Sequence, residues 1–188
     1  MSIAVNVITT ANRTRCFTQP DDIHIHEIFG NLGRCGQLFS SRVLIFGSSG
    51  ETEIFSPSSI TRIEIVTTRD LAEFLPRHLT MGKTTITALP ADSLDNTPES
   101  HIDDEHVAGR FDFFFEGGDT IPTWLEGIRP RDSTEKLMNL TKLFEQPVLL
   151  YKLPQGGVGL MNPSVMTRAV FKSRGLTLPS GAWCVEPI

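Results

Sequence analysis

Cysteine is scarce in this chain of 188 residues. Cys16, Cys35 and Cys184 are an odd number of widely spaced thiols, and no C-x-x-C pair occurs. This pattern fits reduced thiols in a reducing compartment better than a disulfide framework. No basic stretch precedes an apolar one near the N-terminus, so no signal peptide is expected and the predicted location is cytoplasmic.

Long apolar runs and basic clusters are also missing. No run approaches the roughly 18–20 apolar residues of a membrane span, so a soluble protein without a membrane partner is expected. The formal net charge is -5 and the sequence pI is about 5.5, without a cluster of Lys or Arg. Phosphate binding depends mainly on cations, so no nucleic-acid partner is expected either.

Negative charge is concentrated in residues 91–106, which carry six carboxylates and no Lys or Arg; without them the formal charge changes from -5 to +1. Few apolar residues lie there to offset the ordering entropy, so this segment is predicted to be a solvated acidic linker. It separates an N-terminal half, residues 1–90, from a C-terminal half, residues 107–188. Two small domains and a single domain are equally compatible with this length.

Alternating apolar residues and turn sequences predict several strands. Three β-hairpins are expected, around Gly47-Ser48-Ser49-Gly50, around Gly117-Gly118-Asp119 and around Pro154-Gln155-Gly156-Gly157. Further strands are expected over residues 3–9, 60–66 and 83–89. Phe111, Phe113 and Phe115 share one face of the second hairpin, where they are expected to face the core.

Helices are predicted where caps precede apolar residues at helical spacing. These segments are residues 22–33, 70–75, 132–146 and 163–174. Residues 23–27 also alternate as a strand would, which leaves that segment ambiguous. The resulting fold class is α+β, with antiparallel β-hairpins forming one or two sheets and two or three short packed helices.

A short internal similarity links the halves. Pro57-Ser58-Ser59-Ile60-Thr61-Arg62 resembles Pro163-Ser164-Val165-Met166-Thr167-Arg168, and each follows an apolar hairpin. A duplication is one interpretation. Against it, the local signals predict a strand after Pro57 and a helix after Pro163, and four identities in six positions also arise by coincidence.

Histidines and acids offer one candidate metal site. His101, Asp103, Asp104 and His106 lie together in the acidic segment, with Glu105 between them, and His24 and His26 form a second pair. These are ligand types that divalent transition metals accept. His24 and His26 face the same way only if their segment is a strand, because on a helix they point about 200° apart. Neither spacing matches a specific metal motif.

No other catalytic pattern stands out: the chain contains neither G-x-S-x-G nor a P-loop, and no Cys has a His nearby in sequence. We therefore expect a non-enzymatic binding or assembly protein without a cofactor, acting through protein–protein contacts that include sheet edges and self-association into a homo-oligomer. The alternative is a metal-dependent hydrolase or lyase using His24, His26, His101 and His106 with the neighbouring carboxylates. A ligand sensor with an aromatic pocket near Phe113 and Trp124 is a third possibility.

Overall fold

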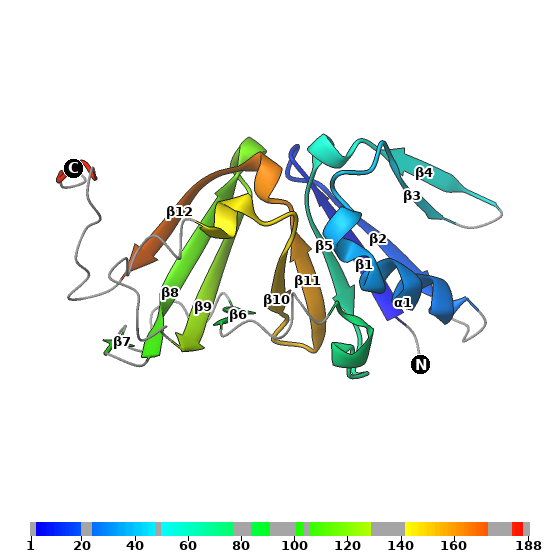
Figure 1. Cartoon of the computed structure of the whole chain (residues 1–188). Coiled ribbons are helices and arrows are strands. Elements are labelled where there is room, and N and C mark those ends of the chain that lie inside the picture. The colour runs from blue at the N-terminus through cyan, green and yellow to red at the C-terminus, as the bar shows by residue number, and fades with distance from the viewer. Residues whose placement is uncertain are drawn as a thin grey trace.

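Strands dominate the fold (Figure 1). The computed structural model describes residues 3–19, 24–47, 50–76, 84–90, 101–103, 106–128, 142–172 and 182–185. Its strands are β1 (Ile3–Thr9), β2 (Thr14–Gln19), β3 (Leu44–Gly47), β4 (Thr52–Phe55), β5 (Ile60–Val66), β6 (Thr84–Ala88), β7 (His101–Ile102), β8 (His106–Phe115), β9 (Thr120–Ile128), β10 (Leu149–Lys152), β11 (Gly157–Met161) and β12 (Met166–Lys172).

Ten of these strands form one sheet in the order β12-β8-β9-β6-β10-β11-β5-β1-β2, with β7 paired to β8 outside that path. Its pairs are antiparallel except for the parallel contact of β10 with β6. Strands β3 and β4 form a separate two-stranded sheet. The three predicted hairpins are confirmed as β3–β4, β8–β9 and β10–β11.

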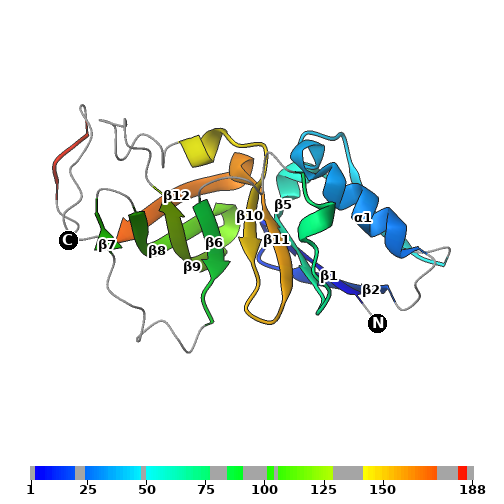
Figure 2. The same cartoon turned by 60° about the horizontal axis from the view of Figure 1, so that its bottom comes forward.

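The predicted α+β class with two or three helices is wrong. Within the described ranges, the single α-helix is α1 (Ile25–Gly33), whose residues Ile25, Phe29 and Leu32 are buried. It covers one face of the sheet beside β1 and β5 (Figure 2). Short 3-10 turns occupy η1 (Cys35–Gln37), η2 (Pro57–Ser59), η3 (Ala72–Phe74), η5 (Glu116–Gly118), η6 (Lys142–Glu145) and η7 (Pro163–Val165). No helix in this part of the chain is long and apolar enough to cross a membrane.

Over its described residues, 163–172, the segment predicted as a helix is a 3-10 turn followed by strand β12. The predicted cap at Asn162 is confirmed, because its side chain accepts a hydrogen bond from the Ser164 backbone N–H. However, the following residues include β-branched and aromatic side chains that suit a sheet, and β12 pairs with β8 over most of its length. Tertiary strand pairing therefore outweighs the local helix signal.

Two other predicted segments are tested only in part. The structure describes residues 142–146 of the helix predicted over 132–146, and η6 lies among them. Residues 91–100, 104 and 105 of the acidic linker also lie outside the described residues. The described part of that segment includes β7, whose residues pair with Ala108 and Val107 of β8.

The fold contains an internal repeat. A constant shift of 106 residues, the separation of Pro57 from Pro163, carries β1 onto β8, β2 onto β9, β4 onto β11, η2 onto η7 and β5 onto β12. We call residues 3–66 the first repeat and residues 109–172 the second repeat. The similar hexapeptides adopt the same conformation in both, a 3-10 turn followed by a strand, which removes the conflict between their sequence signals.

Strand register confirms the repeat at the level of single residues. Strand β5 pairs with β1 as β12 pairs with β8, and both ladders skip one residue, Thr61 in the first and Thr167 in the second. These two hydroxyls donate to the equivalent carbonyl oxygens of Ile8 and Phe114, at 3.2 Å in each case. The β1–β2 and β8–β9 turns also agree, since Asn12 and its counterpart Gly118 both have a positive φ.

Each repeat has its own core. The first core includes α1 and the apolar faces of β1 and β5, and the second includes the three Phe side chains of β8. The repeats differ in their second hairpin. In the second repeat, β10–β11 joins the main sheet by pairing with β5 of the first repeat, whereas β3–β4 in the first repeat remains a separate sheet.

Candidate functional site

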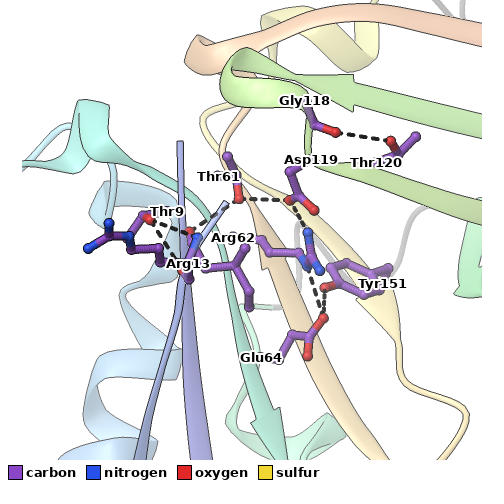
Figure 3. A network of polar contacts seen from close by, with 10 residues as sticks. Thr9, Arg13, Thr61, Arg62, Glu64, Gly118, Asp119, Thr120 and Tyr151 are labelled. Carbon is purple, nitrogen blue, oxygen red and sulfur yellow. Dashed lines mark hydrogen bonds and ion pairs between the residues drawn. The ribbon is translucent and has the colours of Figure 1, made fainter. Parts of the chain in front are cut away.

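The two repeats meet where β11 pairs with β5, and we call this contact the seam. Next to it lies a network of partly or fully buried polar groups (Figure 3). The Arg62 guanidinium forms ion pairs with Asp119 and with Glu64, the latter at 3.0 Å between Nε and Oε1. The Thr61 hydroxyl donates to Asp119 at 2.9 Å. Because Asp119 belongs to the second repeat and Arg62 to the first, the network connects the repeats.

Tyr151 completes the network from β10, and its hydroxyl donates to Glu64 Oε1 at 2.9 Å. The Tyr151 ring lies against Gly159 of β11, where an added Cβ would come within 2.0 Å of the ring carbon Cζ. Burial, reinforced by the Glu64 carboxylate, raises the pKa of Tyr151 well above its usual value. The phenol is therefore neutral and acts as a hydrogen-bond donor, with Gly159 providing the space it needs.

Asn162 connects, through hydrogen bonds, the turns that precede β5 and β12. Its fully buried side-chain amide donates to the carbonyl oxygens of Pro57, at 3.0 Å, and Ile60, at 2.9 Å. Its backbone N–H donates to the Thr61 carbonyl and so extends the β5–β11 ladder. The seam is thus fixed by backbone pairing, a buried amide and a charged network.

The predicted metal ligands fall into two separate groups. His24 immediately precedes α1 and His26 lies within it, so the strand interpretation that placed both imidazoles on one side is wrong. His26 packs edge-on against Phe29 at 6.4 Å between ring centroids. His101 and His106 lie on β7 and β8, toward the opposite end of the main sheet (Figure 1). The structure does not bring the two pairs together.

Asp103 lies between the second pair of histidines. Its carboxylate is 3.0 Å from His101 Nε2 and 3.6 Å from His106 Nδ1, and all three side chains are well exposed. Asp104 and Glu105 lie outside the described residues. Across the described ranges, no group of three or more His, Cys, Asp or Glu side chains is arranged to hold a metal ion.

The cysteines are placed apart and in different environments. Cys16 and Cys184 are exposed, whereas Cys35 is fully buried in the first core. Burial raises the pKa of the Cys35 thiol to about 11. This thiol is therefore protonated at neutral pH and serves as a packing group.

An exposed apolar surface lies on the β3–β4 hairpin. Ile45 and Ile54 face each other across its two strands and are 62% and 66% exposed, and the neighbouring Val43 is also exposed. The opposite face of the hairpin packs on the first core through Leu44, Phe46 and Phe55. We call Ile45 and Ile54 the isoleucine pair. The isoleucine pair is therefore a candidate contact surface on a short two-stranded sheet.

Sequence reasoning missed both the seam network and the isoleucine pair. Arg62 and Asp119 are 57 residues apart in the chain, and Tyr151 is 87 residues from Glu64, so no local spacing connects them. The repeated hexapeptide was the available signal. Its alignment makes β4 the counterpart of β11, so the hairpin that contains β4 can be compared with the hairpin that contains β11.

Comparisons with known proteins add no relative: no protein family, no curated protein and no solved structure matches the chain.

Proposed function

We propose that this protein is a non-enzymatic assembly protein that acts through protein–protein contacts made by its sheets. The observation that carries this proposal is the isoleucine pair, two large apolar side chains exposed side by side on a hairpin whose counterpart in the second repeat is built into the main sheet. Burial of both side chains against a partner would gain roughly 1.5–3 kcal/mol each.

The metal-dependent alternative has less support. It requires His24 and His26 to converge with His101 and His106, and these pairs belong to elements near different ends of the main sheet. No observation on the described residues favours a reaction at either pair, and the assembly proposal is retained.

Light scattering across about 1–100 µM protein tests the assembly proposal, since that range covers ordinary reversible association. The wild-type protein is compared with an Ile45→Ser/Ile54→Ser double variant, and affinity capture from a cell lysate is run on both in parallel. We expect association of the wild type, with itself or with a captured protein, that the double variant loses.

Ile128→Ser is the matched control, because Ile128 is also exposed, at 54%, but lies at the end of β9 away from the hairpin. It should behave as the wild type does. A wild-type protein that stays monomeric throughout, together with the same captured proteins for the wild type and the double variant, would overturn the proposal.

A further inference from the structure

The seam shows how the second hairpin of a repeat packs when another repeat lies beside it. Leu150 of β10 and Leu160 of β11 face each other across their strands, as Ile45 and Ile54 do on β3–β4. Both leucines pack on the core of the first repeat, and Leu160 is only 3% exposed. The hairpin of the second repeat is thus docked, through this leucine pair, on the core of the other repeat.

In the first repeat, the isoleucine pair occupies the same place on its hairpin and remains exposed. Leu160 corresponds to Ile54 by the shift of 106 residues. Leu150 corresponds to Ile45 because the two residues lie opposite Leu160 and Ile54, and the hairpin loop of the second repeat is one residue longer. The same docking surface therefore exists twice in the chain, once buried and once exposed.

The surface that would receive the isoleucine pair also exists twice. Strand β5 receives β11 at the seam, and its counterpart β12 is the terminal strand of the main sheet, beyond which no strand in the described part of the chain lies. On β12, Ala169 and Phe171 pack on the second core as Ile63 and Ile65 pack on the first.

The structure assigns an occupant to both exposed surfaces: we propose that β4 of one copy of this chain pairs antiparallel with β12 of a second copy. The register follows from the seam, where Leu160 lies opposite Ile63 and Gly157 opposite Val66. Shifted by 106 residues, these pairs place Ile54 opposite Ala169 and Glu51 opposite Lys172. This inference rests on the proposed assembly function and names the partner.

Charge complementarity supports this register. Glu51 faces Lys172, and Glu53 lies between Lys172 and Arg168 on the same face of the joined sheet. Opposite charges at directly facing and diagonal positions stabilise paired strands. The contact is head-to-tail, since β4 and β12 are different surfaces, so it builds a ring or an open chain of copies.

The contact between copies is weaker than the seam. At the seam, Asp119 neutralises Arg62. By the shift of 106 residues, the counterpart of Asp119 is Arg13 and the counterpart of Arg62 is Arg168. Arg13 of one copy therefore approaches Arg168 of the next, and their like charges oppose association. Replacing the repulsive group with Arg13→Asp should restore the seam pattern and tighten self-association about fivefold.

Cysteine cross-linking tests the register directly. In a Cys16→Ser/Cys184→Ser background, Ile54→Cys and Ala169→Cys are made in separate proteins with different tags, mixed, and oxidised with oxidised glutathione. Facing residues of antiparallel strands have Cα atoms about 4.5–5.5 Å apart, within the range that a disulfide spans. We expect a mixed disulfide-linked dimer that neither variant forms alone.

The matched control replaces Ile54→Cys with Glu51→Cys, which lies three residues out of register with Ala169 and should cross-link at least tenfold less. Unchanged thermal unfolding of each variant confirms its fold. A mixture that yields no Ile54–Ala169 cross-link, or equal cross-linking out of register, overturns the inference. Light scattering on the same samples then separates the cases: association without the cross-link leaves the assembly function standing, and strict monomers without any captured partner remove both.

Discussion

Over their described residues, the two repeats share an arrangement of strands and turns but make different connections. Each has an antiparallel hairpin, a second hairpin, a 3-10 turn with proline at its start and a strand that returns beside the first. At the seam, the second hairpin docks on the neighbouring repeat and covers a charged network, while the same hairpin in the first repeat leaves two isoleucines exposed. Corresponding strands of the two repeats therefore have different neighbours, and their side chains differ accordingly.

The substitutions between repeats follow from that difference. Gly159 has Glu53 as its counterpart, and Tyr151, which packs on Gly159, corresponds to Phe46 by strand pairing. Glu53 does not need to be buried by another strand. It forms an ion pair with exposed Arg15, which lowers the Glu53 pKa. Variants at matched positions of the two repeats therefore measure how much stability the seam contributes.

The largest difference is expected at Asp119. Asp119→Ala leaves Arg62 with one acidic partner in a mostly buried site, and loss of a buried pair should lower the free energy of unfolding by about 3 kcal/mol. Its counterpart variant Arg13→Ala changes an exposed side chain and should stay within about 0.5 kcal/mol. Urea unfolding of both variants measures this, and similar losses would contradict a special role of the seam.

Gly159→Ala should rank next. The new Cβ meets the Tyr151 ring, which is fully buried and cannot move aside, so overpacking should cost about 2–3 kcal/mol. Glu53→Ala at the matched position removes only an exposed ion pair and should leave the urea midpoint close to that of the wild type. A Gly159→Ala protein as stable as the wild type would mean that Tyr151 does not pack there.

Thr61 and Thr167 give a finer comparison, because both hydroxyls make the same bond to the backbone. Thr61 is fully buried and its single hydroxyl proton is shared between the Ile8 carbonyl and the Asp119 carboxylate, so Thr61→Val should lower the free energy of unfolding by about 2 kcal/mol. Thr167 is exposed, and Thr167→Val should cost about 0.5 kcal/mol. Chemical denaturation distinguishes the two, and equal costs would count against burial as the cause.

The smallest effect at neutral pH concerns Tyr151. Because its pKa is raised in the folded state, the folded protein keeps a proton that the unfolded chain releases above about pH 10, so this group lowers stability as pH rises past that value. Tyr151 is the only tyrosine, so tyrosinate absorbance reports it alone. Folded protein should ionise later than urea-unfolded protein; coincident curves would show an exposed phenol.

The sequence allowed the hairpins to be predicted, because Gly-rich turns between alternating apolar residues depend on local chemistry alone. It also indicated α1, whose apolar residues recur at helical spacing, although the alternation of residues 23–27 left a strand as the rival interpretation. It failed at residues 163–174, where a correct capping signal at Asn162 precedes a strand that exists only because β8 lies beside it. Strand β2 was not predicted at all, since Thr14–Gln19 has little apolar alternation and is held by pairing with β1.

The candidate site was less predictable than the fold. Nothing near Arg62 in the sequence indicates Asp119 or Tyr151, because sheet topology brings them together across two repeats. In the sequence, Ile45 and Ile54 look like ordinary strand residues, and the structure shows that they are exposed. Their counterparts Leu150 and Leu160 pack on a core, and this comparison is the reason to expect a partner. The hexapeptide similarity does indicate the repeat, but the helix prediction after Pro163, which conflicts with it, is wrong.

Amide hydrogen exchange at two protein concentrations, about 1 and about 100 µM, most directly tests whether the exposed hairpin and the terminal strand join two copies. The pairing of β4 with β12 predicts slower exchange in Thr52–Phe55 and Met166–Lys172 at the higher concentration, with β2, the opposite terminal strand, unchanged. Exchange in β4 and β12 that does not depend on concentration, or that slows equally in β2, would contradict it.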